Sequence, residues 1–256
     1  MKPTIEKFKI FLKVMKVLRN WWLYPMVYLK LIKKPTVIFE TRTGVKIMLR
    51  TDSTDLMAFT HVWLIGEYSK NNFQIKKTDT IMDVGAHIGL FSLYASQNCT
   101  EGEIFAFEPI KENYKILESN KKLNKLANIL SENCAISKST SKITLYKSND
   151  EAGHSKFIQT NDPVEVASKS LNDFFKENKI ELINLLKLDC EGSEYEIIDS
   201  LDDKYFEKIE KMIIEYHLAD SNPELLEKLK NKLKYHSYNI FVEPLFQDIG
   251  FLYAKK

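Results

Sequence analysis

The sequence predicts an α/β fold in which helices cover both faces of a mostly parallel sheet that ends in an antiparallel hairpin. From residue 80 onward, short apolar runs alternate with helical patterns, which is typical of β–α–β units. The last two apolar runs, 238–243 and 249–254, leave no room for a helix between them and must pair antiparallel. The pattern before this region differs, so we expect an N-terminal unit (1–75) and a main domain (76–256).

The N-terminal unit is expected to contain an amphipathic helix and a β-hairpin. Residues 1–22 place apolar side chains at every third or fourth position and lysines on the opposite side. A lysine face beside tryptophan suits an anionic membrane surface. We favour the other interpretation, in which this helix packs on the protein's own core or on a second subunit. Strands over 37–40 and 45–49, with Gly44 in the turn, predict the hairpin, and a helix over about 55–65 follows.

The main domain contains five expected core strands, and helices connect most of them. The strands cover residues 81–84, 104–108, 128–132, 182–189 and 211–217. The helices cover about residues 88–97, 111–123, 193–200 and 223–233. The polar segment between the third and fourth core strands is predicted to be poor in strands, with 142–146 as its clearest one.

Composition narrows the class of protein. The 256 residues suffice for one substantial core, and a net charge of +2 with few arginines gives little reason to expect a nucleic-acid partner. Three scattered cysteines predict free thiols and no zinc site. The longest apolar stretch, 21–29, is broken by Pro25 and is too short to cross a bilayer. We therefore expect a cytoplasmic protein, with peripheral membrane contact as an alternative.

A glycine turn follows the first core strand in the segment TIMDVGAHIGLFS, residues 80–92. Gly85 and Gly89 lie at the carboxyl end of that strand, where open parallel sheets bind their ligands. Glu108 ends the next strand, where a carboxylate can accept hydrogen bonds from both ribose hydroxyls of NAD or of S-adenosyl-L-methionine (SAM). Asp83 would repel a pyrophosphate and attract the ammonium and sulfonium groups of SAM. We therefore favour SAM, with an NAD enzyme as the alternative.

Four segments together resemble the FkbM-type methyltransferases, a SAM-dependent group that acts largely on hydroxyls of sugars and other metabolites. They are DVGAHIGLFSLYA (83–95), FAFEPIKENY (105–114), NCAIS (133–137) and LLKLDCEGSEYEII (185–198). The resemblance implies a Rossmann-like class I methyltransferase sheet. It also implies the cofactor-binding residues: Asp83, Gly85, Ala86, His87 and Gly89 at the methionine end, Glu108 at the ribose, Pro109, Asn133 and Ala135 beside the adenine, and Tyr68 closing over the cofactor.

Methyl transfer from a sulfonium is an in-line displacement of an activated leaving group, so the protein mainly aligns the reactants and removes the hydroxyl proton. The candidate catalytic residues lie at the ends of the fourth and fifth core strands: Asp189, Glu191, Glu215 and His217. His217 is a candidate base, and Asp189 either orients it or takes the proton itself. The sequence leaves open whether a divalent metal binds Asp189 together with Glu215 or His217. Lys187 shares a strand face with Asp189 and is expected to pair with a carboxylate.

The expected function is therefore a SAM-dependent O-methyltransferase whose acceptor is a hydroxylated small molecule, a glycan or a glycolipid. The alternative is a catalytically inactive protein that binds SAM, or a partner at a membrane. We expect the acceptor pocket to include the N-terminal segment and residues 147–170, with His154 as a candidate contact. His61 and His236 are interpreted as ordinary surface residues.

Overall fold

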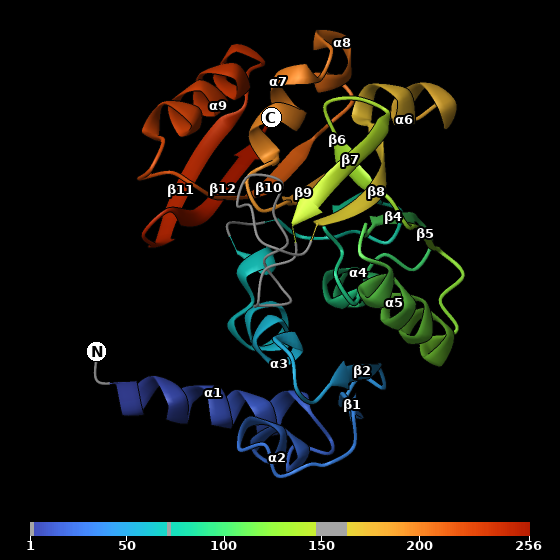
Figure 1. The fold of residues 1–256 in the computed structure, drawn as a ribbon, viewed down its shortest axis with the longest axis vertical. Coiled ribbons are helices and arrows are strands. Elements are labelled where there is room, and N and C mark those ends of the chain that lie inside the picture. Colours follow the sequence, from blue (N-terminus) through green and yellow to red (C-terminus); the bar gives the residue numbers. More distant parts are fainter. Residues whose placement is uncertain (1–2, 71–72, 147–162) are drawn as a thin grey trace.

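A seven-stranded sheet forms the centre of the computed structural model, which describes residues 3–70, 73–146 and 163–256 (Figure 1). Its strand order is β11-β12-β10-β9-β3-β4-β5. The strands are β3 (Thr80–Val84), β4 (Glu103–Phe107), β5 (Ile129–Glu132), β9 (Leu185–Asp189), β10 (Lys211–Tyr216), β11 (Asn239–Phe246) and β12 (Ile249–Lys255). The first five pair in parallel, and β12 lies antiparallel between β10 and β11. The predicted parallel sheet with an antiparallel C-terminal hairpin is confirmed.

Helices cover both faces of this sheet. They are α4 (Leu90–Ser96), α5 (Lys111–Asn124), α7 (Glu194–Ser200), α8 (Asp203–Phe206) and α9 (Pro223–Tyr235). Successive residues of a strand point to opposite faces, and neighbouring strand residues accordingly belong to different apolar cores. Met82 packs in the core that includes Ile198 and Leu233 from α7 and α9, whereas Ile81 packs in the core that includes Leu93 and Leu117 from α4 and α5.

The N-terminal elements join the second of these cores. They are α1 (Pro3–Val17), α2 (Leu23–Tyr28), β1 (Thr36–Glu40), β2 (Lys46–Arg50), α3 (Asp55–Phe59), the π-helix η1 (Thr60–Ile65) and the 3₁₀ turn η2 (Glu67–Ser69). Val14, Leu18 and Phe39 are completely buried in the same cluster as Ile81. The inner face of α1 therefore packs on the protein's own core, as favoured from the sequence, and β1 and β2 form the predicted hairpin.

The segment after β5 differs from the prediction. It forms a second sheet of order β6-β8-β7, followed by a helix: β6 (Ala135–Ser137), β7 (Ser141–Tyr146), β8 (Pro163–Ser170) and α6 (Leu171–Glu177). Only β7 was expected, so the prediction of a strand-poor segment is wrong. The strand β8 is rich in small and polar residues and half-buried, which hides it from an apolar pattern. His154 and residues 147–162 lie outside the described residues.

Two further expectations concern thiols and membranes. Cys99, Cys134 and Cys190 are all free thiols, as predicted. Among the helices that the structure describes, none is both long enough and apolar enough to pass through a bilayer.

Candidate active site

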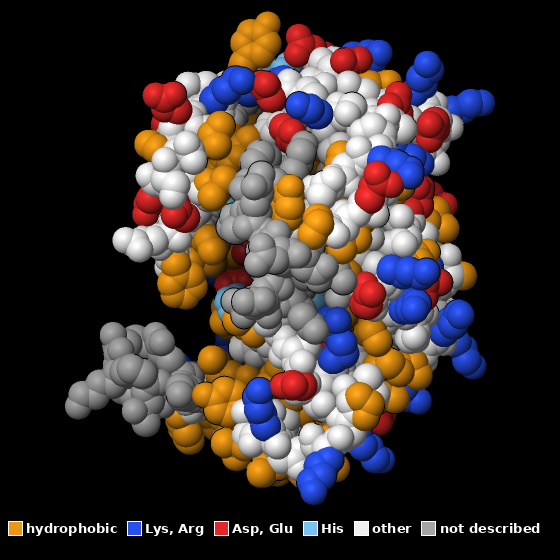
Figure 2. Space-filling view, viewed as in Figure 1, with side chains coloured by type: hydrophobic (Ala, Val, Ile, Leu, Met, Phe, Trp, Pro, Cys, Tyr) orange, Lys and Arg blue, Asp and Glu red, His pale blue; other side chains and the backbone are white. Residues whose placement is uncertain are grey.

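A cavity of about 430 Å³ opens where β3, β4, β9 and β10 end. The strand order reverses at β3: the chain first adds β4 and β5 on one side of β3 and later adds β9 and β10 on the other side. This reversal point is where open α/β sheets bind ligands, and the volume falls in the usual range for small-molecule sites. In Figure 2, acidic and histidine side chains are visible in a hollow between the N-terminal elements and the rest of the molecule.

The loop after β3 forms one wall of the cavity. Gly85 has a φ of +73°, and a Cβ atom there would lie 1.8 Å from the carbonyl oxygen of Asp189. The backbone N–H groups of Gly85 and Ala86 both donate to the carbonyl of Phe107, at 3.0 and 2.9 Å. Only glycine satisfies this close approach of β3 and β9. Gly85, Ala86 and His87 line the cavity.

Two of the predicted cofactor residues do not line this wall. The carboxylate of Asp83 is completely buried, accepts a hydrogen bond from Ser92 at 2.6 Å and pairs with Lys187 at 3.1 Å. Gly89 packs against Leu117 of α5 instead. The prediction that Asp83 and Gly89 line the methionine end of the cofactor is corrected: neither lines the cavity, and both support the loop from behind.

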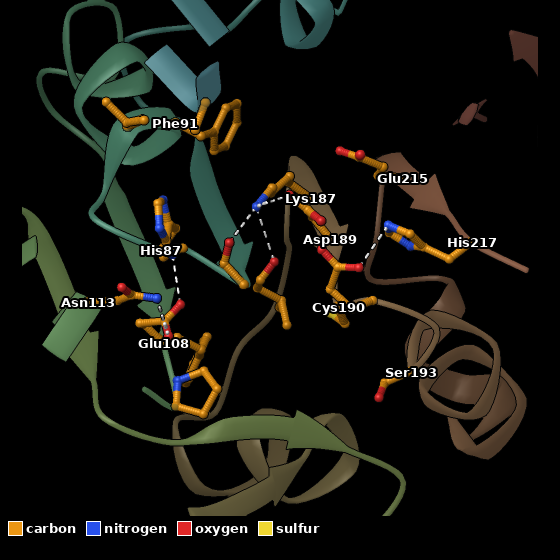
Figure 3. Close-up of a pocket in the computed structure, with 18 of the residues that line it drawn as sticks. His87, Phe91, Glu108, Asn113, Lys187, Asp189, Cys190, Ser193, Glu215 and His217 are labelled. Atoms are coloured by element: carbon orange, nitrogen blue, oxygen red, sulfur yellow. Dashed lines mark hydrogen bonds and ion pairs between the residues drawn. The ribbon is translucent and has the colours of Figure 1, made fainter. Parts of the chain in front are cut away.

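Lys187 connects Asp83 with the cavity. Its ammonium group donates to the carbonyl of Gly85 at 2.8 Å and lies 3.5 Å from Asp189 (Figure 3). Burial lowers the pKa of Lys187, but the carboxylates of Asp83 and Asp189 outweigh it, and the net change is upward. The predicted pairing of Lys187 with a carboxylate is confirmed. Because this pairing neutralises Asp83, the negative charge of the cavity comes from other residues.

Glu108 provides a carboxylate at the end of β4. It accepts hydrogen bonds from the N–H groups of His87 and Ile110, both at 2.8 Å, and it lines the cavity with Pro109. Burial raises its pKa to about 7, although these hydrogen bonds oppose the change. Asn133 lies outside the lining and donates to the carbonyls of Glu108 and Pro109, so it holds the loop. A carboxylate fixed in this way suits the hydroxyls of a ribose.

An apolar wall adjoins Glu108. Ala135 and Ile136 of β6, together with Ile143 and Leu145 of β7, line this side of the cavity. A planar, largely apolar ring fits between such side chains. The predicted contact residue Ala135 thus lines the cavity, and the second sheet that the sequence did not predict supplies its neighbours.

The other end of the cavity is acidic. Asp189 at the end of β9 and Glu215 in β10 both accept hydrogen bonds from the Tyr68 hydroxyl, at 3.3 and 3.1 Å. Burial and the charge of Asp189 raise the pKa of Glu215 to about 8. Burial also raises the pKa of Glu191, to about 7. Tyr68 is both a core residue, packed on Phe91, and part of the cavity wall.

His217 lies immediately after β10 and has acidic partners on both ring nitrogens. Its Nδ1 is 3.2 Å from Glu194, and its Nε2 is 3.5 Å from Glu191. Burial lowers the pKa of His217, but Glu194 and Glu191 raise it to about 10 overall. The imidazole is therefore a cation at neutral pH and has no lone pair with which to take a proton. On this ground His217, one of the two candidates for the base, is poorly suited to that role.

The cluster considered for a metal comes together in space. Ligand atoms of Asp189, Glu215 and His217 lie within 4.8 Å of one another. However, Lys187 lies 3.5 Å from Asp189, and Tyr68 donates to both carboxylates. A divalent ion at this cluster would therefore have to compete with the partners that Asp189 and Glu215 already have.

Sequence reasoning missed two groups near the cavity. His61 of η1 was interpreted as a surface residue, yet it lines the cavity and its Nδ1 lies 3.0 Å from both carboxylate oxygens of Glu67. Arg50 forms a two-pronged ion pair with the buried Asp55, at 2.7 and 3.0 Å, and reaches His87 at 3.3 Å. Neither pair forms a recognisable motif. The only local signal was Gly66, whose left-handed turn brings Glu67 back towards His61.

The strand order, with β12 inserted antiparallel beside β10, and the cavity at the reversal point define a class I methyltransferase. The chain belongs to the FkbM methyltransferase family, because the model "Methyltransferase FkbM domain" matches residues 83–240. This match confirms the family expected from the sequence and supports SAM as its methyl donor.

Several known proteins are similar to this chain. "Methyltransferase 1" of Beauveria bassiana is 28% identical over 164 residues, which cover 55% of this chain and 65% of the relative. The "31-O-demethyl-FK506 methyltransferase FkbM" of Streptomyces tacrolimicus is 24% identical over 213 residues, covering 70% of this chain and 80% of the relative. Among solved structures, TYW2 of M. jannaschii in complex with AdoMet has a TM-score of 0.46 and 15% identity, covering 88% of this chain and 87% of that one.

Proposed function

We propose that this protein is a SAM-dependent O-methyltransferase whose acceptor is a hydroxyl on a sugar, glycan or glycolipid. The observation that carries the proposal is the division of one cavity into two chemically different ends. One end offers the fixed carboxylate of Glu108 and an apolar wall, and the other offers Asp189, Glu215 and the Tyr68 hydroxyl. The first end suits a nucleoside and the second suits a polar acceptor.

The residues present fit SAM as the donor. Glu108 would accept hydrogen bonds from the ribose hydroxyls, and the β6–β7 wall would hold the adenine. The turn from Gly85 to His87 would border the methionine part, next to the acids at the ends of β9 and β10. Bound there, SAM supplies a methyl group that is already activated by the positive sulfur.

The chain's own residues would orient the acceptor. Asp189 and Glu215 can accept hydrogen bonds from an acceptor hydroxyl, with Tyr68 fixing both carboxylates in place. The name of the Streptomyces tacrolimicus relative indicates transfer to an oxygen, which favours O-methylation here. In this proposal the main domain, residues 76–256, binds the donor, and the N-terminal unit, residues 1–75, completes the acceptor side.

Two measurements test the proposal. Isothermal titration calorimetry should detect SAM binding to the wild-type protein and to Asp189→Ala, because the Asp189 side chain lies at the acceptor end. Labelled SAM incubated with cell-envelope glycolipid and polysaccharide fractions should label a fraction with the wild type and lose most of that labelling with Asp189→Ala. SAM binding without transfer to any fraction would favour the alternative, an inactive SAM-binding protein. Absence of SAM binding would overturn both.

The proposal includes peripheral membrane contact, because the N-terminal helices expose many large apolar side chains. Large apolar side chains between residues 8 and 31 are at least 37% exposed: Phe8, Leu12, Trp22, Met26, Tyr28, Leu29 and Leu31. Lysines flank them, among them Lys30, Lys33 and Lys34. Hydrophobic side chains gather over this end of the molecule in Figure 2. Aromatic residues beside lysines suit an anionic bilayer surface.

Vesicle binding tests this part separately. We expect the protein to sediment with vesicles that contain anionic lipid, and the bound fraction to fall as salt rises. Trp22→Ser together with Leu29→Ser should reduce binding without changing the affinity for SAM. Equal binding by this double variant and the wild type would contradict the assignment.

A further inference from the structure

A histidine and a carboxylate from the N-terminal unit form a pair in the wall of the cavity. We infer that His61, oriented by Glu67, is the general base that removes the proton of the acceptor hydroxyl. The inference rests on the proposed methyltransferase function and names a catalytic residue for it. His61 belongs to η1 and Glu67 to η2, both of which precede the segment matched by the family model.

The geometry of the pair is that of an oriented base. Nδ1 of His61 lies 3.0 Å from both oxygens of Glu67, whose side chain is 5% exposed, and the imidazole itself is 35% exposed. A carboxylate only accepts hydrogen bonds, so Nδ1 carries the proton in the neutral ring and Nε2 keeps its lone pair. Among the described residues, Nε2 of His61 has no hydrogen-bond partner.

The surrounding structure fixes the pair in position. Gly66 adopts a φ of +78° and ends the π-helix, which returns the chain so that Glu67 faces His61. The hydroxyl of Tyr253 in β12 donates to the backbone carbonyl of Glu67 at 2.9 Å. The next residue, Tyr68, contacts the acids of the acceptor end. The pair is thus anchored to the same sheet that holds Asp189.

Five other titratable groups of the cavity are less suited to this role. His217 is a cation with acidic partners on both nitrogens. His87 is buried beside Arg50 and Asp55, and burial lowers its pKa to about 4, which makes it a weak base. Lys187 is held by two carboxylates. Glu215 and Asp189 share the Tyr68 hydroxyl, which suits them to hold an acceptor.

The step balances without a further reactant. The acceptor O–H bond breaks and its proton moves to Nε2 of His61, while the oxygen forms a bond to the methyl carbon. The carbon–sulfur bond breaks with its electron pair left on sulfur, so the sulfonium becomes a neutral thioether. Glu67 stabilises the imidazolium until it releases the proton to water.

The charged groups that act on His61 are Glu67 and Asp189. Together, the hydrogen bond to Glu67 and these two charges outweigh burial and raise the pKa of His61 above 6.5. A base works only when deprotonated, so the transfer rate should fall as pH drops through this raised pKa. Glu67→Gln removes the closest charge and should move that fall to lower pH.

The first experiment needs no acceptor. Nitrogen-15 NMR of the wild-type protein, with the ring assigned by comparison with His61→Gln, should show Nδ1 protonated and Nε2 unprotonated in the neutral ring. Titration should give a pKa that falls in Glu67→Gln. A proton on Nε2 in the neutral ring, or a pKa that does not respond to Glu67→Gln, would overturn the inference.

The second experiment measures methyl transfer to the fraction that the wild type labels. His61→Ala should lower kcat about 100-fold or more, as loss of a general base does, with unchanged SAM affinity. Added imidazole should restore part of the rate in His61→Ala but not in His61→Phe, whose ring fills the space. Wild-type activity in His61→Ala would overturn the assignment of His61 as the base, but not the proposed function. A loss of activity in His61→Ala that imidazole does not partly restore would do the same. Absence of transfer by the wild type would instead overturn the proposed function.

Discussion

The buried ion pair between Lys187 and Asp83 predicts a large loss of stability in Lys187→Met. The two charged atoms are 3.1 Å apart, and the side chains are 3% and 0% exposed. Removing the lysine leaves a carboxylate in the core without its counter-charge, which typically costs about 3–5 kcal/mol. For a protein of this size, that loss corresponds to a decrease in Tm of about 6–20 °C.

Urea unfolding of three variants tests this reasoning. Asp83→Asn combined with Lys187→Met removes both charges and should recover most of the free energy of unfolding lost in Lys187→Met. The matched control is Lys228→Met, because Lys228 and Asp199 form a pair of similar length, 3.0 Å, with side chains 66% and 52% exposed. That change should cost less than about 1 kcal/mol. A loss in Lys187→Met no larger than in Lys228→Met would refute the claim that the pair is a buried charge system.

Three further predictions concern the cavity. Gly85→Ala should abolish SAM binding measured by calorimetry and lower Tm, because its Cβ would lie 1.8 Å from the Asp189 carbonyl at a φ of +73°; near wild-type affinity would contradict this. The pKa of Glu108 rises from 4.5 to about 7 on folding. Ionisation of Glu108 therefore destabilises the folded wild-type protein as pH rises through this range. The free energy of unfolding of Glu108→Gln, measured relative to that of the wild type, should increase from acid to alkaline pH. A pH-independent difference would count against a buried Glu108. Methyl transfer should be unchanged by EDTA, because Tyr68 and Lys187 already contact the carboxylates that a divalent ion would need. Loss of activity in EDTA with recovery in Mg²⁺ would show the opposite.

Sequence patterns predicted the main sheet well because its strands are buried on both faces and read as continuous apolar runs. β3, β9 and β10 are nearly fully buried along their length. The antiparallel pairing of β11 and β12 was predicted because the connection between the two strands is too short to hold a helix. The second sheet was missed because β6 has three residues and β8 is half-buried and polar, so neither gives an apolar run.

The positions of Gly85 and Glu108 in the cavity wall were also predictable, since both residues occupy fixed places relative to the ends of β3 and β4. The roles of the charged residues were not. Asp83 looks like a ligand in the sequence but is neutralised by Lys187, which is distant from it along the chain. His217 looks like a base until Glu194 and Glu191 are seen on its two nitrogens. Charge balance depends on contacts between strands, and a local pattern does not encode them.

The placement of η1 and η2 has a consequence for how this scaffold could diversify. Residues 60–69 lie ahead of the segment that the family model matches, yet they border the same cavity. Under the proposed function, exchange of this short stretch would alter the side chains that meet the acceptor and leave those around Glu108 unchanged. Chimaeras in which only these ten positions are replaced are therefore a direct route to altered acceptor selectivity.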